Sequence, residues 1–208
     1  RLIRPDMKGS PSPDLAVSWS ANSQATEWTL KLRDGVKFHD GSAFDSGDVI
    51  YTFNRVLNPE NKSPARSAIK MIEKMEAPDK STVTFKLSTP FADLPLQLMD
   101  YRLRIIPEGS GDSIAASGIG TGPFKLVKFD AAGTTKLEAN MDYWEGAPGV
   151  ANMEIIGIGD GQARLQALLG GQIHFEDKVT NQQKPMFASN NKFKMMEVPT
   201  GNWRGLVF

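Results

Sequence analysis

The sequence of 208 residues contains no cysteine and only two histidines, His39 and His174. The absence of cysteine excludes disulfide frameworks, thiol catalysis and cysteine metal sites. A metal site needs several ligands in one place, and neither histidine has neighbours at metal-ligand spacing. We therefore expect structural or surface roles for both histidines, and we expect neither a metal nor a cofactor.

The sequence also has no net charge, because its 24 Lys and Arg residues balance its 24 Asp and Glu residues. The basic residues are scattered, whereas a nucleic-acid-binding domain needs a basic patch or stripe. No apolar run approaches the roughly 18–20 residues that cross a bilayer. These absences predict no nucleic-acid partner, and they place any membrane link outside this chain.

Enzyme signatures are missing as well. There is no Gly-x-Ser-x-Gly elbow and no Walker-type phosphate loop. Residues 118–122 are glycine-rich, but Pro123 and strand-like residues follow, so no helix N-terminus is available for a phosphate. Tight backbone turning between subdomains is the better interpretation. The acidic side chains of Glu73, Glu76 and Asp130 fit a solvated surface better than a glycosidase pair.

The composition, with 40% hydrophobic and 23% charged residues, is that of a folded globular chain. Apolar and polar residues alternate from Trp28 to Leu32, which predicts a strand with one buried face. Asp34-Gly35 then predicts a hairpin turn, with a second strand over residues 36–38.

The remaining pattern predicts a mixed α/β class with a boundary near Ser110–Gly122. A turn or linker is expected over residues 10–14. Helices are predicted over residues 45–57, 67–75, 91–99 (bent at Pro95) and 162–169. Strands are predicted over residues 83–87, 124–129, 135–139, 153–158 (as a buried strand), 194–198 and 203–208.

Six blocks in a fixed order resemble the family 5 extracellular solute-binding proteins, the peptide/nickel receptors of ABC importers. The blocks are Leu15–Trp19, Trp28–Gly41, Asp48–Phe53, Gly120–Leu126, Leu137–Trp144 and Gly171–Ile173. His174 stands where an Asp is usual in the family, which weakens one turn contact.

The resemblance implies the first lobe of a type II periplasmic-binding-protein fold, with a mixed-sheet core and an outer α+β subdomain. Residues 1–10 and 119–208 would form the incomplete core subdomain, and residues 11–118 the outer one. The chain opens at Arg1 without Met and closes at Phe208 inside an apolar run. We therefore expect both ends to be cuts, and we expect the second lobe to follow.

The resemblance also implies a ligand cleft between two lobes. Alternation would place Arg102 and Arg104 on one strand face, where Arg can clamp a carboxylate; a solvated strand edge is the alternative. Arg104 is the nearest match to a cleft arginine of the nickel-type relatives. We expect Trp144 in the core and Trp203 near the cleft. The candidate ligand contacts are Tyr101, Arg102, Arg104, Gly120, Thr121, Gly122, Asn202, Trp203 and Arg204.

The implied function is capture of di- or oligopeptides by lobe closure and delivery to the ABC permease of the inner membrane, without chemistry. The protein would be a monomer in the periplasm or a cell-surface lipoprotein. An oligosaccharide, an opine-like compound or chelated nickel are alternative cargoes. A hydrolase and a purely structural or interaction domain are the competing classes.

Overall fold

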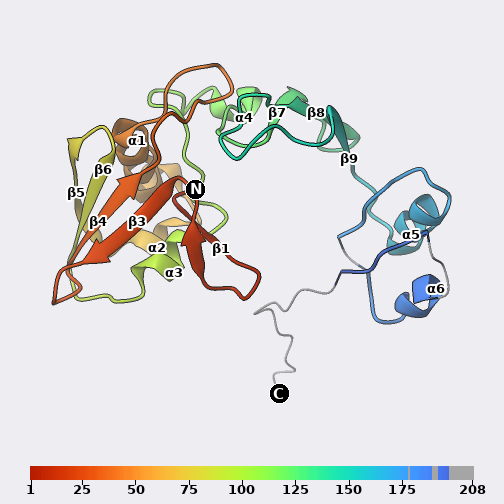
Figure 1. Ribbon diagram of the computed structural model, residues 1–208, viewed down its shortest axis with the longest axis horizontal. Coiled ribbons are helices and arrows are strands. Elements are labelled where there is room, and N and C mark those ends of the chain that lie inside the picture. Colours follow the sequence, from red (N-terminus) through yellow and green to blue (C-terminus); the bar gives the residue numbers. More distant parts are fainter. Residues whose placement is uncertain (178, 189–191, 197–208) are drawn as a thin grey trace. The chain divides into compact units, whose positions relative to one another are not determined.

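The computed structural model describes residues 1–177, 179–188 and 192–196, which belong to two compact units (Figure 1). The first unit comprises residues 1–129 and 135–154, and the second comprises residues 130–134 and those from 155 onward. The first unit contains a four-stranded antiparallel sheet in the order β3-β4-β6-β5. Its strands are β3 (Ala16–Ala21), β4 (Glu27–Leu32), β5 (Ile72–Asp79) and β6 (Thr82–Leu87).

Strand β4 lies inside this sheet and confirms the predicted alternation. Trp28, Leu30 and Leu32 are buried, whereas the residues between them are not. In the register with β6, Trp28 lies opposite Phe85 and Leu30 opposite Val83. Because all of these side chains are apolar, their pairing joins the middle of the sheet to the main hydrophobic cluster.

The predicted hairpin partner of β4 was wrong. Gly35 does make a turn with φ of 70°, but residues 36–38 form no strand, and only Lys37 makes an isolated bridge, to Ala43. Both edges of β4 are already occupied, by β3 and β6. Val36 and Phe38 are therefore buried in a loop that closes on itself through the Phe44 N–H, which donates to the Val36 carbonyl at 3.0 Å.

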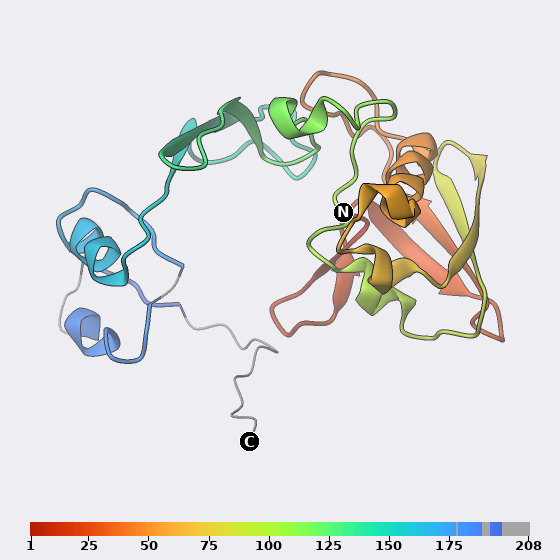
Figure 2. The ribbon, with the colours of Figure 1, turned by 180° about the vertical axis from the view of Figure 1, so that it is seen from behind.

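Helix α1 (Ser46–Leu57) confirms the predicted helix and its cap. The Asp45 carboxylate accepts the Gly47 N–H at 2.8 Å, and the Asp48 carboxylate accepts the Asp45 N–H at 2.8 Å. These bonds satisfy backbone donors that have no partner inside the helix. The helix packs against β5 and β6 (Figure 2), where the Phe53 ring stacks on Phe85 with centroids 5.0 Å apart.

The predicted helix over residues 67–75 was largely wrong. Helix α2 covers only Arg66–Ile69, and β5 begins at Ile72. The register shifts between Ile72 and Lys74, as in a β-bulge, so Ile72 and Met75 face Leu87 and Phe85 on the same side of β6. An apolar spacing of three residues therefore fits a bulged strand as well as it fits a helix.

Two further predictions need correction. Residues 10–14 are not only a turn, because β2 (Pro11–Pro13) pairs with β1 (Ile3–Pro5), with Ser12 opposite Arg4. Proline is tolerated there because each of these two strands has only one neighbour. The helix predicted from residue 91 begins later, as α3 (Leu94–Leu98). Pro95 starts this helix instead of bending it, since a first-turn residue needs no N–H.

A three-stranded sheet follows, in the order β7-β8-β9. Its strands are β7 (Phe124–Lys128), β8 (Thr134–Ala139) and β9 (Asn152–Ile156), so the three predicted strands are confirmed. The predicted burial of the third was wrong, because Ile155 and Ile156 are 54% and 41% exposed. An apolar β-branched run favours a strand, but it does not determine what covers that strand.

The second unit contains α5 (Gly161–Leu169), which was predicted, and α6 (Lys184–Ala188), which was not. Leu165 and Leu168 of α5 form a small buried cluster with Phe187. Residues 194–196 of a predicted strand are not in one, and residues 197–208 lie outside the described residues.

The first unit also contains two short helices, η1 (Pro59–Asn61) and α4 (Ile114–Ser117). No helix in the described ranges is long and apolar enough to cross a membrane.

The stacked pair between α1 and β6 yields a stability prediction. Phe53→Ala should lower the free energy of unfolding by about 3–5 kcal/mol, because it leaves a cavity at a site that is 1% exposed. Phe129→Ala is the matched control: this ring is 63% exposed, so the change should be within about 0.5 kcal/mol. Urea unfolding followed by tryptophan fluorescence measures both. Equal effects would contradict the packing described here.

Candidate functional site

The first unit contains a cavity of about 470 Å³ that gathers residues from distant parts of the chain. Its walls come from the first β-hairpin, the turn at His39, residues 104–106, residues 118–123, and the pair Tyr143-Trp144. This volume lies in the range of about 300–1,000 Å³ that is usual for small-molecule sites. Charged groups and exposed backbone are combined in one hollow.

One wall of the cavity is residues 118–123, here called the glycine loop. The loop starts where α4 ends, at Gly118, which has φ of 59°. A Cβ at this position would lie 2.7 Å from Leu126 Cδ2, so both the backbone angle and the space require glycine. The sequence predicted tight turning in this segment, and Gly118 supplies it.

The glycine loop is fastened to the turn at His39. The His39 N–H donates to the Gly120 carbonyl at 2.9 Å. The Gly120 N–H donates to His39 Nδ1 at 3.2 Å, and His39 Nε2 lies 3.0 Å from the Gly122 carbonyl. The buried Asn140 amide donates to the same carbonyl at 3.0 Å. This histidine therefore has a structural role, as the sequence predicted.

Three arginines line the cavity, and two of them are paired. Arg1 lies 3.9 Å from the Asp14 carboxylate, and Arg4 binds Glu145 through two hydrogen bonds of 2.8 and 2.5 Å. Arg104 uses Nε to donate to the Tyr101 carbonyl at 2.7 Å. Its two terminal nitrogens have no protein partner among the residues that the structure describes. Within the described ranges, Arg104 is thus the cavity arginine that has no carboxylate partner.

The pKa shifts within the cavity distinguish the two pairs, because the Asp14 carboxylate at 3.9 Å does not offset the burial of Arg1. Burial, with the nearby charge of Arg104, lowers the pKa of the Arg1 guanidinium. The hydrogen bond to Arg4 lowers the pKa of Glu145. A carboxylate brought into the cavity would therefore meet a positive field that originates chiefly from one exposed guanidinium.

Tyr143 and Trp144 form the aromatic side of the cavity. The Trp144 ring packs against the main core and lies under the Arg33 guanidinium, 4.1 Å from the ring centroid. The Tyr143 hydroxyl donates to Glu145 Oε2 at 2.7 Å. Burial and, to a smaller extent, the hydrogen bond to the Glu145 carboxylate together raise the pKa of Tyr143 to about 12.

The structure brings four of the nine predicted contacts together, since Arg104 and residues 120–122 line one cavity. Tyr101 is 68% exposed and does not line it. Arg102 instead binds the Asp100 carboxylate and donates to the Pro64 carbonyl at 3.0 Å. Asn202, Trp203 and Arg204 lie outside the described residues.

The predicted strand face that would unite Arg102 and Arg104 does not exist, because residues 101–106 contain no strand. Arg102 folds back onto a carboxylate two residues earlier, and this local ion pair directs the side chain differently from that of Arg104. Sequence reasoning missed Arg4 and the loop-fastening role of His39. The only available signal was that the blocks around His39 and Gly120 both belong to the family resemblance.

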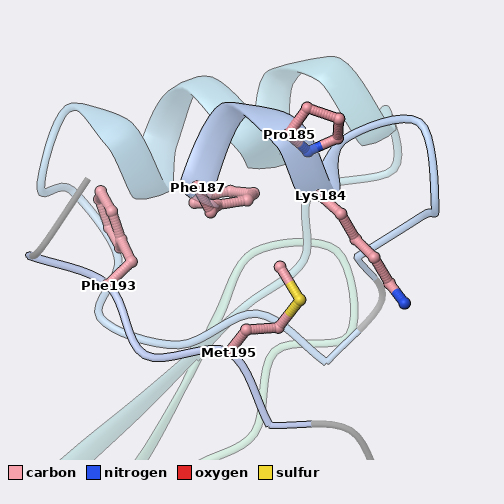
Figure 3. A pocket seen from close by; sticks show the side chains of 5 residues that line it. All are labelled: Lys184, Pro185, Phe187, Phe193 and Met195. Carbon is pink, nitrogen blue, oxygen red and sulfur yellow. The ribbon is translucent and has the colours of Figure 1, made fainter. Parts of the chain in front are cut away.

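A larger hollow of about 580 Å³ lies in the second unit (Figure 3). Phe187, Phe193, Pro185 and Met195 give it a mainly apolar lining, and the two phenylalanine rings meet edge to face at 5.3 Å. It contains none of the predicted contacts. Figure 3 shows the Lys184 side chain reaching away from the aromatic pair. We place the candidate site in the smaller cavity, because only there do several polar groups converge.

A family profile described as bacterial extracellular solute-binding proteins, family 5 Middle, matches residues 10–208. The chain is a family 5 solute-binding protein. Members of this family are binding receptors and not enzymes, so the predicted lack of catalysis is confirmed. No group of three or more His, Asp or Glu side chains that could hold a metal occurs in the described part of the chain.

Named relatives agree with this assignment. The glutathione-binding protein GsiB of Pectobacterium atrosepticum is 31% identical over 191 residues, covering 89% of this chain and 37% of GsiB. AgaA of A.tumefacien R10, solved with agropinic acid, is 31% identical with a TM-score of 0.77, covering 83% of this chain and 36% of AgaA. AppA of Bacillus subtilis, solved with a nonapeptide, is 28% identical with a TM-score of 0.80, covering 91% of this chain and 40% of AppA.

These matches establish a mixed α/β fold that corresponds to part of the family 5 receptors. The chain spans little more than a third of the length of the relatives that it matches. The family identification made from six sequence blocks is therefore confirmed, while the properties of a whole receptor belong to the proposal below.

The Tyr143–Glu145 contact yields a pH prediction. Because the folded-state pKa of Tyr143 is raised to about 12, its contribution to stability is complete below the ordinary tyrosine pKa of about 10 and is lost as the pH rises toward 12. Stopped-flow pH jumps read at 295 nm, before alkaline unfolding, should show a late-titrating tyrosine signal that belongs to Tyr143.

Two variants test the origin of this late titration. Tyr143→Phe should remove the late component. Glu145→Gln should lower the pKa of Tyr143 while leaving it above the ordinary value, since burial is the main cause of the shift. A late component that persists in Tyr143→Phe, or the absence of any late component in the unmodified chain, would contradict the described contact.

Proposed function

We propose that this chain forms the first-lobe part of an ABC-importer substrate-binding protein that captures carboxylate-bearing solutes, above all di- and oligopeptides. Capture is by enclosure between lobes, and the receptor then delivers its cargo to a membrane permease. It works in the periplasm or as a cell-surface lipoprotein. The proposal rests chiefly on one observation, the unpaired Arg104 beside the glycine loop in a cavity of ligand size.

The chemistry of Arg104 supports a carboxylate as the recognised group. A guanidinium presents donors in a planar fork that matches the two oxygens of a carboxylate. Its Nε bond to the Tyr101 carbonyl at 2.7 Å fixes the side chain and leaves the terminal nitrogens for a ligand. Arg4 is already bound to Glu145, and Arg1 lies 3.9 Å from Asp14 and donates to the Met99 carbonyl, so they add less to solute binding.

The relatives support the same class of cargo. GsiB is named for glutathione, and AppA and AgaA were solved with a nonapeptide and agropinic acid. Glutathione and ordinary peptides end in carboxylates, and agropinic acid is an acid by name. Two of these three solutes are peptides, which favours peptide cargo. The 31% identity to AgaA makes an opine-like acid the second candidate.

The enclosing mechanism is supported by length and fold. This chain covers 37% of GsiB and 40% of AppA, so a receptor of their size has room for a second lobe. We assign residues 1–10 and 119–208 to the core of the first lobe and residues 11–118 to its outer subdomain. Tyr101, Arg102, Asn202, Trp203 and Arg204 remain proposed contacts at the rim of the cleft. Hinged closure of two lobes would bury the solute and exclude water.

Arg104→Ala should weaken binding of a tripeptide to the two-lobed receptor by roughly 10- to 100-fold, since hydrogen bonds to a charged group contribute about 1.5–3 kcal/mol. Arg66→Ala is the matched control, because this exposed arginine also donates through Nε to a backbone carbonyl, that of Leu57 at 2.8 Å, and does not line the cavity. Isothermal titration calorimetry measures both variants.

The same tripeptide with an amidated C-terminus identifies the recognised group. It should bind more weakly than the free acid, and Arg104→Ala should then have little further effect, because the charged partner is already gone. Equal losses for Arg66→Ala and Arg104→Ala, or unchanged affinity in Arg104→Ala, would remove Arg104 from the site.

A further inference from the structure

The ring of His39 is bonded in a way that only its neutral form permits. A backbone N–H can only donate, so Nδ1, which receives the Gly120 N–H at 3.2 Å, must be unprotonated. The ring proton then sits on Nε2 and is donated to the Gly122 carbonyl at 3.0 Å. One imidazole therefore binds both the Gly120 N–H, a donor, and the Gly122 carbonyl, an acceptor.

We propose that His39 is a positioning residue that makes the shape of the solute cavity depend on pH. Protonation adds a hydrogen to Nδ1, which then faces the Gly120 N–H donor to donor. The bond to Gly120 is lost, while the bond from Nε2 to Gly122 can remain. The Gly120 N–H is thereby released from the ring, and the cavity wall loosens at acidic pH although the His39 N–H still binds the Gly120 carbonyl at 2.9 Å.

The charged groups around the ring have defined partners. On its own turn, Asp40 accepts hydrogen bonds from the Ser42 hydroxyl at 2.7 Å and from the Ser42 N–H at 3.0 Å. These bonds lower the pKa of Asp40, so it is a carboxylate at both ends of the relevant pH range. The other groups that line the cavity with His39 are Arg1, Arg4, Arg104, Asp14 and Tyr143.

The α-amino group of Arg1 must be separated from His39 in any titration between pH 5 and 8, because burial lowers its pKa to about 6. The only other histidine, His174, is exposed and belongs to the second unit. In a chain whose α-amino group is acetylated, a pH response of the glycine loop that is lost in His39→Asn is therefore attributable to His39.

A positioning role and a direct ligand-contact role predict opposite changes in solute affinity as the pH falls. If His39 bound the solute carboxylate, protonation would tighten binding as the pH fell. If it positions the loop, loosening of the wall weakens binding as the pH falls. This consequence depends on the proposed function, whereas the response of the loop does not depend on any ligand.

The deciding measurement is an NMR titration of the full chain, labelled with ¹⁵N, from pH 8 to pH 5. The His39 ring and the Gly120 amide should titrate together, and hydrogen exchange at Gly120, corrected for intrinsic rates, should accelerate roughly three- to tenfold as the ring is protonated. If the chemical shift and the exchange rate of the Gly120 amide do not change through the His39 transition, the proposal is wrong.

Two variants sharpen the test. His39→Asn keeps an acceptor near the position of Nδ1 and has no titrating proton, so the Gly120 response should disappear; its survival would contradict the proposal. His174→Gln is the matched control and should leave the response intact. If His39→Asn does not fold, the titration of the wild-type chain with an acetylated α-amino group still decides the question.

Solute binding is tested separately in the two-lobed receptor, with glutathione as the probe, at pH 8 and pH 5. Weaker binding at pH 5 that is absent in His39→Asn supports positioning, and tighter binding at pH 5 contradicts it. Absence of glutathione binding at both pH values counts against the proposed cargo, and the Gly120 titration then decides the role of His39 alone.

Discussion

The candidate site depends on how the glycine loop is held. Residues 118–123 have no regular secondary structure, so their backbone groups need partners from elsewhere. His39 contributes its backbone N–H and both ring nitrogens, and Asn140 contributes its side-chain amide. Two polar side chains thus give a glycine-rich segment a fixed position beside Arg104. Without these bonds the cavity would lose one of its walls.

Charge pairing gives this cavity its chemical character. The sequence is neutral as a whole, and most of its cations near the cavity are matched by carboxylates. Selectivity therefore does not come from a general positive surface. It comes from one guanidinium that is fixed by a backbone carbonyl and has no carboxylate partner within the described residues. This arrangement suits a receptor that must bind a small anion and later release it.

The sequence predicted local structure well where one element determines its own pattern. The alternation in β4 and the Asp45 cap of α1 are examples. It failed where distant segments decide the outcome. Residues 36–38 could not pair with β4, because β3 and β6 occupy both of its edges, and a bulge in β5 imitated helical spacing.

The site was predictable to a similar extent. The family resemblance pointed to Arg104 and residues 120–122, which do line one cavity. The pairing of Arg4 with Glu145 joins residues 141 positions apart, and no local sequence pattern could predict it. That pairing matters, because it separates the arginine that is available to a solute from those that serve the fold.

The most direct test of the central claim is native mass spectrometry of the protein isolated from its own cells without added solute. The account predicts co-isolated carboxylate-bearing molecules, most characteristically a series of short peptide masses that is lost in Arg104→Ala. A neutral sugar as the only bound species, or a peptide series unchanged in Arg104→Ala, would contradict it.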